Sequence, residues 1–493
     1  MLPLPAWHKE RAMTATATPS TPTPDATGAA LRPLAEVPGA TTSVGVGREI
    51  LRIRSNILLA LEQNSQRFGN VFQLSAPGTA PHLFLNTPEA AKEVLLTRQD
   101  DFRKSGQYKI LQRVLGFGLV TSEGELWREH RTIVQPMFAK RALGDFAVHM
   151  ANAATTALDR WDATWTTDER IDMSTEMSAL TLDIVGRALV GTDFSARSSE
   201  FGAALHSMLG AAGEIGRAPT TQVLGGIRKI GVGRAMRLQP GRMRRMNVAI
   251  DVLDDVILEI IGNRRGGAAE HDDLLAVLMD YRHPETGAPL TETHVRDELM
   301  TFVTAGHETT ANGLTWMWSL LSQHPEARER LVEEVDEVLG GRVPTAADLD
   351  ALPWATACFQ EAMRLFPPVW MVQRAAKVDT QLAGYFVPAG TVVSVSPWVL
   401  HHDPEHWPNP YAFDPRRFLG DAAKQRPRTA YLPFAAGRRM CIGQGFAMME
   451  ATLLTAMLTQ RYTFDLLPGT PLEPEPTITL RPRYGMPMQA RRR

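Results

Sequence analysis

Hydrophobic positions along the chain follow mainly helical spacing. Apolar side chains recur three and four positions apart between residues 247 and 261, and a longer segment at 291–323 keeps a helical pattern until Pro325. Residues 135–190 also combine polar faces with apolar stripes. Extended patterns predict short strands at 70–74, 82–86, 391–395 and 477–480. A short helix is predicted at 88–96. The pattern predicts a mainly α fold with a small β portion.

The first 40 residues lack this patterning. Residues 14–24 contain only Thr, Ala, Pro and Ser, a composition that cannot bury enough apolar surface to fold. We therefore predict a disordered tail at 1–40 and one continuous domain at 41–493. The tail has no apolar run of the length of a signal peptide or a spanning helix, so we expect a cytoplasmic protein without a transmembrane anchor. Met13 is an alternative start.

Composition excludes several classes of protein. The chain has 44% hydrophobic and 22% charged residues and a net charge of -2, which suits a soluble enzyme and gives no general attraction to nucleic acid. The two cysteines, Cys358 and Cys441, are too few for a disulfide framework and fit a reducing compartment. Cys358 lies in an apolar helical stretch, where we expect a buried structural thiol.

Cys441 lies in a loop rich in glycine and arginine that leads into a helix. Glycines such as Gly437 and Gly443 let the backbone approach a flat molecule closely. Backbone N–H groups of the next helix, with Arg438 and Arg439, are expected to lower the thiol pKa and stabilise a thiolate. The alternative is that Cys441 is only a small hydrophobe at a helix start.

The spacing F-x-x-G-x-R-x-C-x-G, from Phe434 to Gly443, resembles the haem-binding signature of the cytochrome P450 family. The resemblance implies the cytochrome P450 fold over roughly residues 41–493. It also implies haem b (iron protoporphyrin IX) as cofactor, with the Cys441 thiolate as the iron ligand and Phe434 and Arg439 in the cofactor-binding loop.

The long helix at 291–323 carries a second motif, Ala305-Gly-His-Glu-Thr-Thr310. A glycine inside a helix costs about 1 kcal/mol relative to alanine, and threonines can bond back to the preceding turn and bend it. The run resembles the family's oxygen-activation motif. This implies that Thr309 hydrogen-bonds dioxygen and that Glu308 belongs to the proton-delivery network. Alternatively, the threonines only kink a buried helix and Glu308 meets a buried basic partner. His307 is given no role.

Two further motifs suggest structure and cofactor binding. Glu361 and Arg364, three apart on one helical face, lie among apolar residues, and Arg417 is the candidate third partner. They resemble the family's structural triad beneath the cysteine loop. Buried ions need such further partners.

Four residues resemble the family's contacts to the haem propionates: Trp127, Arg131, Arg374 and Arg439. Arginine suits this task because its planar guanidinium can pair with a carboxylate through two hydrogen bonds. His130 could also reach a propionate.

The resemblance implies a monooxygenase that inserts one oxygen atom from O2 into a lipophilic substrate of the fatty acid, terpenoid or carotenoid class. Electrons would come from a separate ferredoxin or flavodoxin with its reductase, docking near the cysteine loop with help from Arg128, Arg438 and Arg439. Alternatives are a peroxide-driven peroxygenase or a rearranging enzyme, and a non-enzymatic haem sensor or electron carrier. Thr309 and Glu308 argue against these.

Residues 215–250 contain no acidic side chain but many basic ones interleaved with apolar ones. The basic residues are Arg217, Arg228, Lys229, Arg234, Arg237, Arg242, Arg244 and Arg245. One interpretation is a peripheral membrane contact that collects lipophilic substrate. The other is a solvated basic loop.

Overall fold

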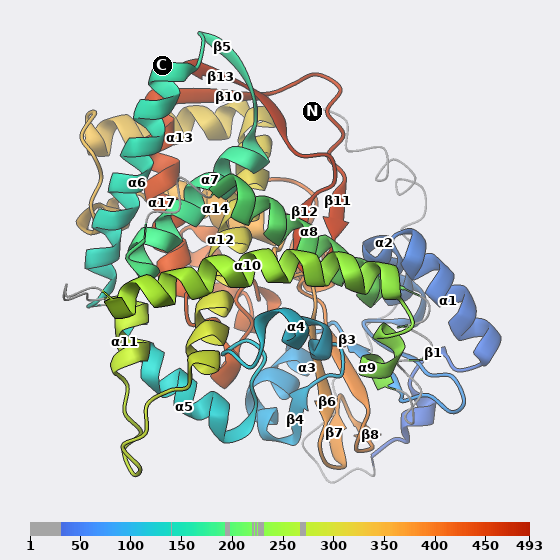
Figure 1. Cartoon of the computed structure of the whole chain (residues 1–493). Helices are drawn as coiled ribbons and strands as arrows, with labels where there is room; N and C mark the ends of the chain where they lie inside the picture. Colours follow the sequence, from blue (N-terminus) through green and yellow to red (C-terminus); the bar gives the residue numbers. More distant parts are fainter. Residues whose placement is uncertain are drawn as a thin grey trace.

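A computed structural model describes residues 31–139, 141–192, 198–218, 221, 224, 231–266 and 273–493. Helices account for most of this part and the sheets are small (Figure 1), which confirms the expected mainly α class with a small β portion. Within the described ranges, no helix combines the length and the apolar character needed to cross a bilayer.

The helices and strands follow in chain order. The helices are α1 (Ser43–Ser55), α2 (Ile57–Phe68), α3 (Pro88–Lys92), α4 (Tyr108–Leu115), α5 (Gly124–Val134), α6 (Leu143–Thr164), α7 (Met173–Val185), α8 (Ser198–Arg217), α9 (Gly231–Met236), α10 (Pro240–Gly266), α11 (Leu274–Asp280), α12 (Glu292–Gln323), α13 (Pro325–Leu339), α14 (Pro353–Leu365), α15 (Pro397–His401), α16 (Gly420–Gln425) and α17 (Gln444–Arg461). The strands are β1 (Gly39–Ala40), β2 (Val71–Leu74), β3 (His82–Leu85), β4 (Phe102–Lys104), β5 (Asp168–Asp172), β6 (Val372–Ala376), β7 (Thr380–Leu382), β8 (Tyr385–Val387), β9 (Val392–Val395), β10 (Tyr462–Leu466), β11 (Pro474–Pro476), β12 (Leu480–Pro482) and β13 (Pro487–Arg492).

Helix α12 forms the centre of the molecule. Its N-cap Thr291 accepts a hydrogen bond from the N–H of His294, and the helix stops before Pro325. It packs against α7, α10, α14 and α17, and most of its residues are buried because it is covered on nearly all sides.

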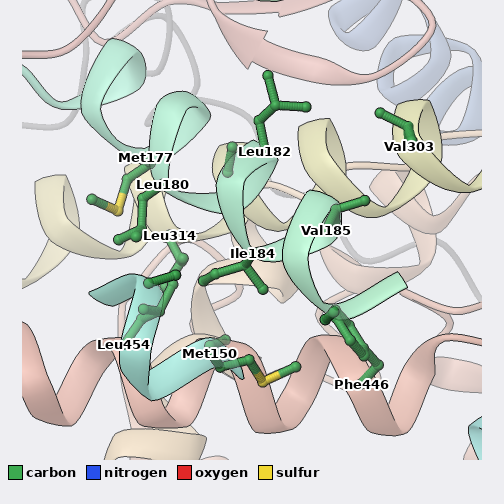
Figure 2. Close-up of a cluster of buried hydrophobic side chains, with 14 of the residues drawn as sticks. Met150, Met177, Leu180, Leu182, Ile184, Val185, Val303, Leu314, Phe446 and Leu454 are labelled. Carbon is green, nitrogen blue, oxygen red and sulfur yellow. The ribbon is translucent and has the colours of Figure 1, made fainter. Parts of the chain in front are cut away.

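The main core lies between α6, α7, α12 and α17 (Figure 2). Met150 of α6, Ile184 of α7, Val303 of α12 and Leu454 of α17 are fully buried in it. Burying one such side chain contributes about 1.5–3 kcal/mol. This core holds α12 and α17, and with them the segments that carry the two sequence motifs, at a fixed separation.

The main sheet has the strand order β1-β2-β3-β9-β6-β4 and lies to one side of the helices. β2 and β3 are antiparallel, whereas β3 and β9 are parallel, with Leu83 opposite Val393. Smaller sheets have the orders β10-β13-β5, β11-β12 and β7-β8. The β11-β12 hairpin turns at residues 477–479, beside the cavity described below.

The expected tail boundary at residue 41 is wrong for residues 31–40. Arg32 bridges to Tyr385, and β1 pairs in parallel with β2, with Gly39 opposite Gln73. A Cβ at position 39 would lie 2.0 Å from the carbonyl oxygen of Gln73, so this strand approaches its neighbour through a glycine. Residues 1–30 lie outside the described part.

Two local expectations also differ from the structure. The segment at 135–190, expected to be helical, includes β5, which pairs with β13 near the C-terminus (Ile171 opposite Met488). The expected strand at 477–480 is wrong for residues 477–479, which form the turn between β11 and β12, whereas Leu480 begins β12. The N–H and the hydroxyl of Thr477 both donate to the carbonyl of Thr479 and close this turn. The strand β5 forms because of a partner strand far away in the sequence, and the turn at 477–479 is closed by a side-chain hydrogen bond. Hydrophobic periodicity contains neither kind of information.

Candidate active site

A cavity of about 1070 Å³ lies between α12, the loop before α17, α8 and the β11-β12 turn. Its wall is largely apolar. It is lined by all eight residues that the sequence assigned to catalysis or cofactor binding, namely Trp127, Arg131, Glu308, Thr309, Arg374, Phe434, Arg439 and Cys441. These residues come from segments more than 300 positions apart, so the fold brings the separate motifs to one place.

The loop that carries Cys441 is fixed by backbone contacts. Gly437 has a φ of +74°, and a Cβ there would lie 1.9 Å from the carbonyl oxygen of Leu95, so only glycine fits. The N–H of Cys441 donates to the carbonyl of Phe434 at 3.0 Å. Arg131 donates to the carbonyl of Met440 at 3.2 Å. The thiol is therefore held at the cavity wall by the backbone contacts of its loop and by the Arg131 side chain.

The electrostatics of the thiol differ from the expectation. Burial raises the pKa of Cys441, and the Gly443 N–H and the Arg131 guanidinium offset this only in part. Arg438, expected to lower the pKa of this thiol, instead pairs with Asp100 at 2.8 Å. Arg439 lies 3.8 Å over the ring of Trp127. The expected lowering by these two arginines is wrong because each is engaged elsewhere.

Cations gather at one end of the cavity. Arg374 is buried and donates to the carbonyl of Gln373 at 2.9 Å. Lys104 lies beside Arg374 and Arg439, and burial together with Arg439 lowers the pKa of Lys104 to about 6. Like charges crowd together here, so the cluster fits a ligand that brings anionic groups.

Sequence reasoning missed Lys104 and Tyr108 at this end of the cavity. Tyr108 accepts a hydrogen bond from Arg374 at 3.5 Å, and Lys104 donates to the carbonyl of Ser122 at 2.8 Å. Lys104 ends β4, where it pairs with Arg374 of β6, and Tyr108 follows four residues later at the start of α4. No local motif marks them.

Helix α12 remains continuous through its motif. The hydroxyl of Thr309 donates to the carbonyl of Ala305 at 2.7 Å, the back-bond that threonine can form in a helix. Gly306 allows close packing against α7, since a Cβ there would lie 3.1 Å from Val185. Thr309 and Ala305 nevertheless line the cavity.

Glu308 is held by a hydroxyl rather than by a basic partner. Its Oε1 accepts a hydrogen bond from Thr479 at 2.7 Å, and burial raises the pKa of its carboxyl. Arg481 opposes that rise only through its charge. Sequence reasoning missed Thr479, which lies in the turn between β11 and β12.

The two histidines near these motifs have partners of their own. His307 Nε2 lies 2.8 Å from the Ser178 hydroxyl, and burial lowers the pKa of His307 to about 4. His130 Nδ1 lies 2.5 Å from Glu298 Oε1, and both side chains are fully buried. Neither histidine lines the cavity.

The expected structural triad is present. Arg364 donates to both carboxylate oxygens of Glu361, and Arg417 Nε lies 3.3 Å from Glu361 Oε1. Cys358, on the same helix α14, is fully buried, and burial raises the pKa of its thiol. Both expectations are confirmed.

Comparison with known proteins identifies the family. The family model described as Cytochrome P450 matches residues 38–486. The chain belongs to the cytochrome P450 family. Cytochrome P450 132 of Mycobacterium bovis is 37% identical over 415 residues, covering 83% of this chain and 87% of the relative. Cyclooctat-9-en-7-ol 5-monooxygenase of Streptomyces melanosporofaciens is 36% identical over 385 residues, covering 78% and 80%.

A solved structure supports the same fold. The crystal structure of the cytochrome P450DA heme domain matches this P450 with a TM-score of 0.77 at 26% identity, covering 88% of this chain and 93% of that one. The chain is a haem-thiolate monooxygenase with haem as its cofactor. The cavity fits that group, because it combines a sulfur donor on a glycine-opened loop with clustered cations for two propionates.

Proposed function

We propose that this P450 inserts one oxygen atom from O2 into a lipophilic small molecule, with electrons from a separate ferredoxin- or flavodoxin-type protein and its reductase. The observation that carries the proposal is one large apolar cavity that is lined both by Cys441 and by Thr309 and Glu308 of α12.

Residues at the ends of the cavity are assigned to haem binding. Cys441 would bind the iron through its sulfur. Arg131, Arg374 and Arg439 would pair with the propionates, with Trp127 stacked beneath Arg439. Phe434 lines the same wall and holds the Cys441 N–H through its carbonyl. The bound haem, with its thiolate ligand, supplies cleavage of the O–O bond.

Thr309 and Glu308 are assigned to proton handling. The Thr309 hydroxyl is satisfied by Ala305, and rotation about its χ1 angle would let it donate into the cavity instead. Burial raises the pKa of Glu308, so its carboxyl holds a proton more readily than an exposed one. A hydroxyl and a protonated carboxyl on adjacent residues can pass a proton into the cavity. This arrangement suits O2 as oxidant better than added peroxide.

The substrate class rests on the wall of the cavity and on one relative. The wall includes Leu209, Ala212, Met363, Val369 and Ile478, which suits fatty acids, terpenoids or carotenoids. The Streptomyces relative is named for oxidising a cyclic alcohol, and this favours the terpenoid class. Arg128 is exposed and lines the same surface pocket as Arg438 and Arg439. Arg438 is paired with Asp100, so Arg128 is the cation of this group that supports an acidic electron donor.

The test is a screen of lipophilic compounds against the ferric protein, followed by turnover of those that shift the Soret band. Turnover with a ferredoxin, its reductase and reduced nicotinamide under ¹⁸O2 should give products that carry one labelled oxygen atom. Products formed only with added peroxide, or without the label, would contradict the proposal and favour a peroxygenase or a rearranging enzyme.

A further inference from the structure

Helix α12 and the cysteine loop are joined through the chain segment 117–131, which ends within α5. Asp297 of α12 accepts a hydrogen bond from the Phe117 N–H at 2.7 Å. Glu298, the next residue of α12, contacts His130 of α5, with 2.5 Å between its Oε1 and the histidine Nδ1. Two consecutive acidic residues of α12 therefore hold this segment near both of its ends.

The same segment contacts the cysteine loop at three points. The carbonyl of Ser122 accepts a hydrogen bond from Arg439 at 3.0 Å, and the Arg439 guanidinium lies 3.8 Å over the ring of Trp127. Arg131 donates to a carbonyl of the cysteine loop at 3.2 Å. His130 lies between Trp127 and Arg131 in the sequence. A rotation of α5 relative to α12 would therefore move the side chains assigned to the haem propionates.

The contact between His130 and Glu298 is poorly suited to stabilising the fold. Both side chains are fully buried, and among the described residues His130 Nε2 and Glu298 Oε2 have no hydrogen-bond partner. A buried polar pair with unsatisfied atoms has a desolvation cost that two apolar side chains of similar volume would avoid. What the pair supplies is direction, because a hydrogen bond depends on angle, whereas apolar packing does not.

Other contacts of α5 have less directional character. Ile133 and Val134 are buried in the main core, where packing has no angular preference. Glu129 accepts a hydrogen bond from Tyr281 at 3.0 Å, but both of these side chains are partly exposed. The contact of His130 with Glu298 is directional and fully enclosed, so it can fix the rotation of α5.

We propose that Glu298 and His130 are positioning residues of the haem site. Their hydrogen bond fixes α5 against α12 and so holds Trp127 and Arg131 against the cysteine loop. This inference rests on the assignment of these two residues to the haem in the proposed function. It makes haem retention, rather than the free energy of unfolding, the quantity that depends on the pair.

The experiment measures the rate of haem transfer from the ferric holoenzyme to excess apomyoglobin, together with the reduction potential of the iron. The double variant His130→Phe/Glu298→Leu removes the hydrogen bond and leaves neither polar group unpaired. It should fold with a Tm near that of wild type and transfer haem about tenfold faster, the size of effect typical of residues that orient a ligand. Its reduction potential should fall, because a displaced Arg131 compensates the propionate charge less well.

Two further variants separate direction from charge and from hydrogen bonding in general. Glu298→Gln keeps an oxygen that can accept from His130 Nδ1 and should retain haem as wild type does. Tyr281→Phe removes the partly exposed hydrogen bond to Glu129 of α5 and should also leave the transfer rate unchanged. A Glu298→Gln variant that loses haem as fast as the double variant would contradict the directional role.

The remaining outcomes also decide the matter. A double variant with the wild-type transfer rate, or one that does not fold, would overturn the inference, since the pair would then have no role or a purely stabilising one. Arg131→Ala tests the underlying assignment by itself and should transfer haem faster than wild type. A wild-type rate in Arg131→Ala would refute the assignment of this residue to the haem, and the inference with it.

Discussion

Arg364 donates to both carboxylate oxygens of Glu361, at 2.7 Å each, and neither side chain has any exposed surface. Arg364 also donates to the carbonyls of His401, Pro410 and Ala412. The pair therefore joins α14 to the segment that precedes the Cys441 loop. Its strength depends on this full set of partners, since a buried ion pair by itself is weakly stabilising.

Glu361→Ala leaves the buried Arg364 guanidinium without its carboxylate. We expect a loss of roughly 3–5 kcal/mol in unfolding free energy, which gives apo or aggregated protein, measured by haem content and thermal unfolding. Glu329→Ala on α13, where the side chain is exposed, is the control and should be neutral. A folded, haem-replete Glu361→Ala with only slower turnover would refute the structural role.

Cys441→Ala should remove the long-wavelength band of the reduced protein with carbon monoxide, together with most of the haem. Cys358→Ala is the matched control, because this thiol is buried on α14 away from the cavity. It should keep the band, and its free energy of unfolding should fall only by the cost of a small cavity in the core. A wild-type spectrum in Cys441→Ala would overturn the assignment of the iron ligand.

Thr309→Ala removes the hydroxyl that donates to Ala305 and keeps a strong helix former. We expect near-normal Soret shifts with substrate, continued consumption of reduced nicotinamide, less product and more hydrogen peroxide. The measurement is product formed per reduced nicotinamide, with Thr309→Ser as the variant that retains coupling. Unchanged coupling in Thr309→Ala would mean that the hydroxyl only bonds to its own helix.

Replacing Arg242, Arg244 and Arg245 together by Gln tests the membrane interpretation of the basic stretch. Glu214 pairs with Arg242 at 3.2 Å and with Arg245 at 2.5 Å, so part of this charge is already neutralised. Arg228 and Lys229, assigned to the same stretch, lie outside the described residues. We expect weaker sedimentation with anionic vesicles at low salt and an unchanged haem spectrum.

The control for this triple variant removes the same charge from Arg491, Arg492 and Arg493 at the C-terminus. If wild-type protein ignores anionic vesicles at low salt, the stretch is a solvated basic surface.

Glu62→Gln tests a pH dependence. Glu62 is buried and accepts a hydrogen bond from Trp398 at 2.6 Å, and burial raises the pKa of its carboxyl to about 8. The folded protein thus keeps this proton up to about pH 8, whereas the unfolded chain loses it near pH 4.5. The contribution of Glu62 to the free energy of unfolding is therefore greatest below pH 4.5 and declines as the pH rises from 4.5 to 8.

The Gln variant carries no such proton, so its Tm relative to wild type should increase by a few degrees between pH 5 and pH 8.5. For Glu329→Gln on α13, the difference in Tm from wild type should stay constant over the same pH range. A constant difference for Glu62→Gln as well would show that the carboxyl ionises alike in both states.

Residues within dense local motifs could be predicted from the sequence, and residues brought in by remote pairing could not. Cys441, Thr309 and Glu361 carry their spacing with them, and the structure brings the first two to one cavity and the third to its ion pair. Lys104 reaches the cavity only because β4 pairs with β6, and Thr479 only because a hairpin turns beside α12. Sequence periodicity carries no information about such contacts.

The electrostatics of the site were predicted least well. Arg438 does not lower the pKa of Cys441 because it pairs with Asp100. This pairing could not be predicted, since Asp100 lies more than 300 residues away in the chain. The pKa of Cys441 likewise depends on burial by the whole fold.

The contact between Gly437 and the carbonyl of Leu95 limits how this protein can be changed. A library that randomises position 437 should yield holoprotein from glycine codons alone, because any side chain would have to displace the main chain of a neighbouring helical turn. The Arg131 side chain reaches the Met440 carbonyl and is also assigned to a propionate, so a substitution at position 131 would alter the loop and the binding of the cofactor together. The immediate surroundings of the sulfur therefore leave protein engineers little freedom.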